Sequence, residues 1–243
     1  MNKTQLTDFI TKYTLGGEIK STKWTSNGNS LSTRFISGDK SVVGRVELSK
    51  FNHLSPCELG VYNTGQLSSL LSVLGDDVDV SLSNSGDKFI SMEFVDTKRK
   101  TKSKYMLSDL SVIPTPPELK NLPDSFELGI KVDPYFVSTF ISGKGALSEA
   151  ETFTILTENN ETKIVIGYAS IASNRVTIPV ETTKYKEIEP ISFNANMFAS
   201  ILNANKDCES ATLEVSSAGL SRIQFSIDNY DSEYFLVSTQ AVN

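Results

Sequence analysis

The chain has 243 residues, of which 39% are hydrophobic and 21% are charged, and its formal net charge is -6. This composition is ordinary for a folded protein of one large or two smaller domains, and it argues against extensive disorder. The acidic balance also argues against a protein that coats nucleic acid through a uniformly basic surface, although a protein that is acidic outside could still surround nucleic acid.

Four segments have the apolar spacing of amphipathic helices and are bracketed by start and stop signals. They span residues 4–14, 63–75, 133–143 and 194–205. In the third segment Asp133 followed by Pro134 is typical of a helix start, and Gly143 is expected to end the helix. Either Asn194 or Asn196 is expected to cap the fourth helix.

Between these helices, apolar and polar residues alternate with period two, as in NSLSTRFIS, DVDVSLS, TKIVIGY, ATLEVSS and SRIQFSID. This alternation predicts strands with one buried face. Turn signals such as Asn27-Gly28 and Ala218-Gly219 separate them, so most connections are expected to be hairpins and the sheets largely antiparallel. The predicted fold class is therefore α+β.

The helix starts recur at intervals of roughly 60, 70 and 60 residues, which indicates an internal repeat of one helix followed by three or four strands. The longer middle interval contains SVIPTPPELKNLP, whose prolines favour a linker. We therefore predict an N-terminal domain over residues 1–110, a linker over 111–123 and a C-terminal domain over 124–243, each domain with two repeats.

The four predicted helices are almost uncharged. Their 47 residues carry only Asp8, Lys12 and Asp133 as charges, whereas the chain average of 21% predicts about ten. A solvent-exposed helix face without carboxylates is compatible with a nearby polyanion, because a carboxylate repels phosphate. The alternative is an uncharged face hidden in an oligomer contact. The candidate DNA-facing residues on and around these helices are Lys3, Lys12, Lys20, Ser68, Ser69, Ser72, Lys131, Ser138, Thr139, Ser142, Lys144, Ser200, Asn203 and Lys206.

A helix that follows a strand and precedes a hairpin-rich sheet, twice on each side of a proline-containing connector, resembles the DNA sliding-clamp family. CELGVYNTGQLSSLLSVLGDDVDVSL is similar to the strand, second helix and following strand of the clamps of T-even-type bacteriophages. FNANMFASILNA and LEVSSAGLSRIQFSID are similar to their last helix and hairpin. The resemblance to PCNA-like clamps covers nearly the whole chain, and it implies a ring around duplex DNA with helices lining the hole and sheets outside.

The resemblance implies a processivity factor that tethers the replicative DNA polymerase and has no cofactor or catalysis of its own. It further implies a clamp loader as partner and the cytoplasm of an infected bacterial host as location; whether transcription factors are an additional class of partner is left open by the sequence. Packing helices about 10 Å apart gives a bore of roughly 15 Å for eight helices and roughly 28 Å for twelve. A B-form duplex is roughly 20 Å across, so a homotrimer is expected.

By analogy with three-subunit clamps, the strand 105–110 is expected to pair with a strand near 176–180 of the next subunit. Pro179 suits such an edge strand, although it removes one donor from the ladder. The candidate interface residues are Tyr105, Met106, Leu107, Leu110, Val176, Ile178 and Val180.

Clamps are also similar in holding short apolar tails of polymerases and loaders in a groove beside the interdomain linker. The matching positions here are Ile36, Val42, Val43, Val112, Ile113, Leu119, Leu122, Val237 and Ala241. The alternative is that several of these side chains only seal the linker onto the sheets.

The run TKRKTKSK is the strongest local positive field in the sequence, with Lys98, Arg99, Lys100, Lys102 and Lys104. It could touch the DNA backbone or help loading, or it could be a solvated hairpin tip.

No phosphate loop, metal-spaced cluster or nucleophile elbow is present, which argues against catalysis. Asp76, Asp77 and Asp79 look like a cation site, but their alternation with valines favours a turn and the wet face of a strand. His53 is the only histidine, too few ligands for a typical metal site.

No run of about 18 apolar residues could span a bilayer, and the N-terminal MNKTQLTDFI lacks the apolar core of a signal peptide, so we expect a cytosolic protein without a membrane partner. Cys57 and Cys208 each stand alone, which favours thiols in a reducing compartment. Two rival functions are a β-rich virion or scaffold protein, and a viral processivity subunit that binds DNA electrostatically without forming a ring.

Overall fold

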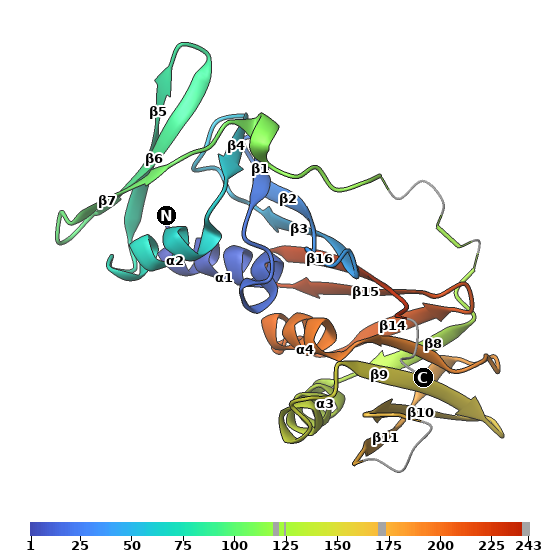
Figure 1. Cartoon of the computed structure of the whole chain (residues 1–243). Helices are drawn as coiled ribbons and strands as arrows, with labels where there is room; N and C mark the ends of the chain where they lie inside the picture. The colour runs from blue at the N-terminus through green and yellow to red at the C-terminus, as the bar shows by residue number, and fades with distance from the viewer. Residues whose placement is uncertain (119–121, 124, 170–173, 240–243) are drawn as a thin grey trace. The chain divides into compact units, whose positions relative to one another are not determined.

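Helices and antiparallel strands alternate along the chain in the computed structural model, which describes residues 1–118, 122–123, 125–169 and 174–239 (Figure 1). The chain divides into two units. Unit 1 comprises Met1–Gly38, Gly44–Pro117 and Asp228–Ser232. Unit 2 comprises Asp39–Val43, Glu118–Ile227 and the chain from Glu233 onward. The predicted domain boundaries at 110 and 124 place residues 39–43 in the N-terminal domain and residues 228–232 in the C-terminal domain. In the structure each of these short segments belongs to the other unit. No helix in the described residues is long and apolar enough to cross a membrane.

Unit 1 builds two antiparallel sheets beside two helices. Its elements are α1 (Lys3–Thr14), β1 (Thr22–Ser26), β2 (Ser30–Ile36), β3 (Val42–Ser49), β4 (Cys57–Val61), α2 (Thr64–Ser72), β5 (Val78–Ser85), β6 (Lys88–Asp96) and β7 (Lys102–Met106), with 3₁₀ helices at Leu15–Gly17 and Leu110–Val112. The strands β3, β2, β1 and β4 are neighbours in that order, and β5, β6 and β7 form the second sheet. Trp24 of β1 lies opposite Thr33 of β2 and Leu59 of β4, so the core runs along β1.

Unit 2 repeats this plan. Its elements are β8 (Leu128–Val132), α3 (Pro134–Ala146), β9 (Thr152–Glu158), β10 (Glu161–Ile166), β11 (Val176–Val180), β12 (Thr182–Lys184), β13 (Ile191–Asn194), α4 (Ala195–Ala204), β14 (Ala211–Ser216), β15 (Leu220–Ile227) and most of β16 (Tyr230–Val237). The start of β16 up to Ser232 belongs to unit 1, and Val42 and Val43 at the start of β3 belong to unit 2. The strands β12, β8, β14, β15 and β16 are neighbours in that order, and β11, β10, β9 and β13 form the second sheet. The predicted α+β class and the predicted strands are confirmed, although five strands of the described chain, not three or four, separate α3 from α4.

Each helix begins at an asparagine or aspartate whose side chain accepts a backbone N–H, as is usual for a helix cap. The caps are Asn2, Asn63, Asp133 and Asn194, and the hydrogen bonds measure 2.8, 3.0, 2.9 and 3.0 Å. The two caps of each unit are separated by the same number of residues, which confirms the internal repeat. The first helix begins at Lys3 because Asn2, rather than the predicted residue 4, supplies the cap.

The third helix does not end at Gly143 as predicted but continues to Ala146. The glycine has another role there. A Cβ atom at Gly143 would lie 3.0 Å from Cγ1 of Val176 and 3.3 Å from Cδ1 of Ile166. The missing side chain therefore lets α3 lie close against β10 and β11.

The core of unit 1 is an aromatic cluster that joins α1 to the sheet and to α2. Phe9 and Tyr13 of α1 meet Trp24 edge to face, with ring centroids 5.5 and 6.3 Å apart. The Trp24 indole N–H donates to the Tyr13 hydroxyl at 3.2 Å, and that hydroxyl donates to Oγ1 of Thr64 at 3.3 Å. Burial raises the pKa of Tyr13 far above its usual range, so the hydroxyl is held neutral and can donate.

The core of unit 2 is built from phenylalanines. Phe198 of α4 stacks on Phe153 of β9 and meets Phe140 of α3 edge to face, each at a centroid distance of 4.9 Å. Phe193 of β13 lies 5.7 Å from Phe153. Because all four rings are fully buried, this cluster fixes both helices of unit 2 on the sheet.

Candidate nucleic-acid interface

The helices of unit 1 bury their apolar sides and expose polar side chains. On α2, Leu67 and Leu71 are buried, while Ser69 and Ser72 are exposed and Ser68 is half-buried. Helix α1 packs beside α2 (Figure 1). The exposed side of α2 therefore carries hydroxyl groups and no charged side chain.

The helices of unit 2 follow the same division. On α3, Phe136 and Phe140 are buried and Ser138 and Ser142 are exposed. Tyr135, one turn before Ser138, is the most exposed large apolar side chain among the described residues of the unit, at 77%. No signal in the sequence singles it out, because a lone aromatic residue in an apolar helix start has no distinctive pattern.

Three of the exposed serine hydroxyls already donate within their own helices. Ser69 donates to the Gly65 carbonyl at 3.0 Å, Ser72 to the Ser69 carbonyl at 2.7 Å and Ser138 to the Tyr135 carbonyl at 2.9 Å. A hydroxyl has a single hydrogen to donate, so these groups offer acceptor lone pairs outward. Contact with a phosphate would then pass through bridging water rather than a direct bond.

Carboxylates are nearly absent from the helices. The four helices lie wholly within the described residues, and they contain one acidic residue, Asp8 of α1, beside Lys3, Lys12 and Lys144. Negative charge is therefore concentrated on strands, turns and loops. A polyanion beside the helices would meet little repulsion.

The predicted DNA-facing residues fall into three groups by exposure. Exposed are Lys20, Ser69, Ser72, Lys131, Ser138, Ser142, Asn203 and Lys206; half-buried are Lys3, Ser68, Thr139 and Ser200; buried are Lys12 and Lys144.

The two buried lysines differ from the expectation of a solvent-facing lining. Lys12 is 6% exposed and its ammonium lies 5.3 Å from the centre of the Tyr230 ring. Lys144 is 8% exposed and donates to the carbonyl of Ser148 at 2.7 Å, beyond the end of α3. Both cations are satisfied inside the fold, one by an aromatic face and one by helix-end carbonyls.

Two further lysines are also engaged. The Lys3 ammonium donates to the carbonyl of Leu74, just past the end of α2. Lys131 pairs with Glu181 at 2.9 Å and Asp133 at 3.7 Å, and the hydrogen bond to Glu181 raises its pKa. Lys20 and Lys206 form no ion pair in the described residues and keep their charge available. Because the other four predicted lysines are buried or engaged, the helix surroundings are less basic than the sequence predicts.

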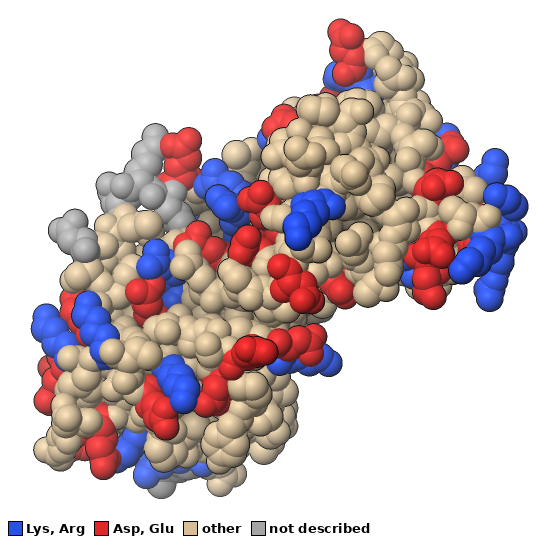
Figure 2. All heavy atoms as spheres, turned by 180° about the vertical axis from the view of Figure 1, so that it is seen from behind, with Lys and Arg blue, Asp and Glu red and all other residues tan. Residues whose placement is uncertain are grey.

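The basic run forms the connection between β6 and β7, and residues 97–102 are called the basic tip below. The Asp96 carboxylate, 2% exposed, accepts backbone N–H bonds from Lys98 at 2.8 Å, Arg99 at 2.7 Å and Gly75 at 2.7 Å. The bonds from Arg99 and Gly75 hold the pKa of Asp96 below its usual range. Figure 2 shows basic side chains gathered where the β6–β7 hairpin ends.

The strands predicted to form a subunit interface are both edge strands. The strand β7 ends the order β5-β6-β7, and β11 ends the order β11-β10-β9-β13. The predicted strand 105–110 is wrong in its bounds: the strand is β7, Lys102–Met106, and a 3₁₀ helix begins at Leu110. Pro179 lies on β11, where a missing N–H is tolerated.

The predicted interface residues are unequally exposed. Met106 is exposed; Leu107, Leu110, Val176 and Val180 are half-buried; Tyr105 and Ile178 are buried. The Tyr105 hydroxyl accepts the backbone N–H of Asn63 at 2.9 Å, which ties β7 to the start of α2. Tyr105 therefore has a structural role inside its own unit.

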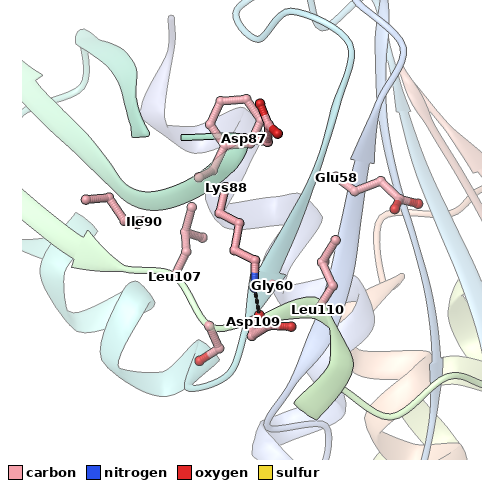
Figure 3. Close-up of a pocket in the computed structure, with 10 residues that line it drawn as sticks. Glu58, Gly60, Asp87, Lys88, Ile90, Leu107, Asp109 and Leu110 are labelled. Carbon is pink, nitrogen blue, oxygen red and sulfur yellow. Dashed lines mark hydrogen bonds and ion pairs between the residues drawn. The ribbon is translucent and has the colours of Figure 1, made fainter. Parts of the chain in front are cut away.

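A pocket of about 430 Å³ opens beside the continuation of β7. Its apolar lining comes from Phe89, Ile90, Leu107 and Leu110, and Gly60 forms part of its wall. Figure 3 shows Lys88 reaching across it to Asp109, and this ion pair holds the Asp109 pKa well below its usual range.

Comparison with solved structures identifies the arrangement. The structure of Proliferating Cellular Nuclear Antigen from Entamoeba histolytica superposes with a TM-score of 0.74, over 98% of this chain and 96% of that chain, at 15% sequence identity. The chain has the PCNA-like sliding-clamp fold. No protein-family profile matches the sequence, and no curated protein matches it either.

The clamp fold leaves the predicted partner-groove positions divided between the two units. In unit 1, Ile36 is half-buried, Val112 is exposed and Ile113 is buried beside β4. Ile113 therefore seals the linker onto its own unit, as the alternative interpretation expects.

In unit 2, Val42 and Val43 are buried, whereas Leu122 and Val237 are exposed at 39% and 44%. Leu119 and Ala241 lie outside the described residues.

No group of three potential metal ligands occurs among the described residues of this clamp fold. Asp79 lies on β5 and Asp77 precedes it, as the alternation predicts. His53 is exposed beside the Phe51 ring, and partial burial lowers its pKa. Cys57 and Cys208 are both thiols, and burial raises the pKa of Cys57, which makes it a weak nucleophile.

Proposed function

We propose that this chain is one protomer of a homotrimeric sliding clamp that encircles duplex DNA and acts as a processivity factor. The observation that carries the proposal is the pair of helices in each unit that carries almost no acid, within a sliding-clamp fold. Such a lining neither repels phosphate nor holds it tightly. Attachment then comes from enclosure, which permits sliding.

The homotrimer is supported by the edge strands. The open edge of β7 carries exposed Met106, and an unpaired edge with an apolar side chain is a site for strand pairing. The edge of β11 supplies a second unpaired strand on the other unit. Because each protomer brings one edge from each unit, head-to-tail pairing can close a ring, and twelve helices around a bore of roughly 28 Å would accommodate a duplex.

The proposed partners are duplex DNA without sequence preference, a DNA polymerase, a clamp loader and, in addition, transcription factors. The exposed Val112, Leu122 and Val237 are candidate contacts for apolar tails of these proteins. The similarity of CELGVYNTGQLSSLLSVLGDDVDVSL to the clamps of T-even-type bacteriophages supports a phage origin and work in the host cytoplasm. No reaction is assigned to the chain itself.

Native mass and DNA topology test this proposal. Light scattering should give three times the 26.7 kDa of one chain. Protein assembled on nicked circular plasmid should stay bound through gel filtration and should be released when the same plasmid is linearised. Equal retention on circular and linear DNA would contradict enclosure.

The two rival functions give other outcomes. A scaffold protein should form assemblies larger than a trimer or ignore DNA topology. A processivity subunit that does not form a ring should dissociate steeply with salt from circles and linear DNA alike.

A further inference from the structure

The basic tip is held in one conformation by the chain around it. Asp96 accepts the N–H groups of Lys98 and Arg99, and the Asp96 N–H donates to the Thr101 carbonyl at 2.8 Å. Lys100, at the turn, has a φ of 60°, a conformation that side chains other than glycine rarely adopt. The positive side chains are therefore presented by a hydrogen-bonded turn rather than by an irregular loop.

The tip stands at one end of the helix pair of unit 1. The Asp96 carboxylate binds the N–H of Gly75, just past the end of α2. The N–H of Thr97 donates to the carbonyl of Asp77 at 3.0 Å, and the N–H of Lys3 donates to that of Asp76 at 2.7 Å. The end of α2, the start of α1 and the tip are thus joined through residues 75–77.

The positive charge of the tip is only partly neutralised. Lys98 pairs with Asp77 at 3.2 Å, and Lys104 on β7 pairs with Glu93 at 3.3 Å. Arg99, Lys100 and Lys102 are exposed and form no ion pair in the described residues. In a chain of net charge -6, three cations without an ion pair at one hairpin end are a strong local field.

We propose that Arg99, Lys100 and Lys102 bind phosphates of the duplex DNA backbone at the α2 end of the helix lining. This inference rests on the proposed function, because it takes the helix faces to line the DNA channel. Ser69 and Ser72 already use their donors within α2, whereas guanidinium and ammonium groups donate directly to phosphate. The tip therefore supplies the direct, salt-dependent contact that the helix faces lack.

The test measures binding to a short linear duplex over a range of salt concentrations, by fluorescence anisotropy. The variant is R99Q/K100N/K102Q, with asparagine at 100 because it tolerates the positive φ. The control K163Q/K184Q/K186Q removes the same number of positive charges from unit 2. Circular dichroism and native mass should be unchanged in both variants.

The slope of log K against log salt should become shallower by about 0.9 for each phosphate that the variant no longer binds, and the control should keep the wild-type slope. A tip variant with the wild-type slope would overturn the proposal. If that variant also bound poly-glutamate less tightly than wild type, the tip would be assigned to an acidic protein surface instead.

Failure of the proposed ring function and failure of the proposed phosphate contact give different experimental results. Linear duplexes report the phosphate contact, whereas release on linearising a plasmid reports enclosure. Wild-type protein that shows tip-dependent binding but no topological retention would reject the ring and retain the phosphate contact.

Discussion

The carboxylate of Asp96, at the end of β6, accepts the backbone N–H of Gly75 at 2.7 Å, so the second sheet of unit 1 is tied to the chain just past α2. The approach leaves no room for a side chain, since a Cβ at Gly75 would lie 2.5 Å from the Asp96 oxygen. One carboxylate thus orients the basic tip and anchors it to a helix end.

Replacing Asp96 with asparagine should lower the melting temperature at neutral pH, because the amide nitrogen cannot accept the N–H bonds that the replaced oxygen accepted. The pKa of Asp96 in the folded chain lies below its ordinary value of 3.8. The carboxylate therefore stabilises the fold above that value, and this contribution is lost as the pH falls through the lower folded pKa. Melting curves from about pH 7 to about pH 2 should show wild type and variant converging in acid. Asp87→Asn, in the exposed β5–β6 turn, serves as control. A difference in melting temperature between wild type and the Asp96 variant that stays constant at all pH values would contradict the stabilising role of the Asp96 carboxylate.

Acid on the helix faces should weaken retention on DNA. In the double variant Ser69→Glu and Ser138→Glu, each protomer places a carboxylate on the exposed face of one helix in each unit. Repulsion of phosphate should speed release from nicked circular plasmid severalfold, and more at low salt than at high salt. Ser55→Glu, in the exposed loop before β4, is the control. Retention equal to that of wild type would mean that these faces do not meet DNA.

A charge on the β7 edge should break the proposed ring. Met106 is 60% exposed on that edge, and burying a glutamate there against a partner strand costs far more than burying a methionine. Met106→Glu should shift the native mass from trimer to monomer, as measured by light scattering. Ser85→Glu, at the exposed end of β5, should leave the trimer intact. A trimeric Met106→Glu protein would place the interface elsewhere.

The secondary structure was predictable because its signals are local. Apolar periodicity marks all four helices, and the caps at Asn63 and Asp133 stand next to the segments that they start. The prediction that Gly143 ends the helix is wrong, because the role of Gly143 depends on Val176, a residue far along the chain. A glycine that ends a helix and one that lets a helix approach a strand have the same sequence signature.

The candidate site was less predictable for the same reason. Lys12 and Lys144 look like solvent-facing cations in the sequence. In the structure both are buried, Lys12 over the ring of Tyr230 and Lys144 donating to the carbonyl of Ser148. The anchoring of the basic tip depends on Asp96 and Gly75, which no motif links. Composition could indicate that the helices avoid acid; only the three-dimensional contacts show which cations are already engaged.

Truncation of Phe198 should cost far more stability than truncation of Tyr135. Phe198 is fully buried between Phe153 and Phe140, so Phe198→Ala should lower the free energy of unfolding by about 3–5 kcal/mol. Tyr135 is 77% exposed, and Tyr135→Ala should stay within about 0.5 kcal/mol of wild type. Denaturant unfolding of both variants measures the difference. Similar losses would contradict the packing of α4 in unit 2.

Two glycines of α3 should respond differently to alanine. Gly145 has open space where a Cβ would stand, so Gly145→Ala should raise the free energy of unfolding by about 0.5–1 kcal/mol through helix propensity. Gly143→Ala gains the same propensity but pushes a methyl group to 3.0 Å from Cγ1 of Val176. Overpacking should leave it at least about 1 kcal/mol less stable than Gly145→Ala. Urea unfolding compares the two, and equal gains would show that α3 does not lie as close to β11 as the fold requires.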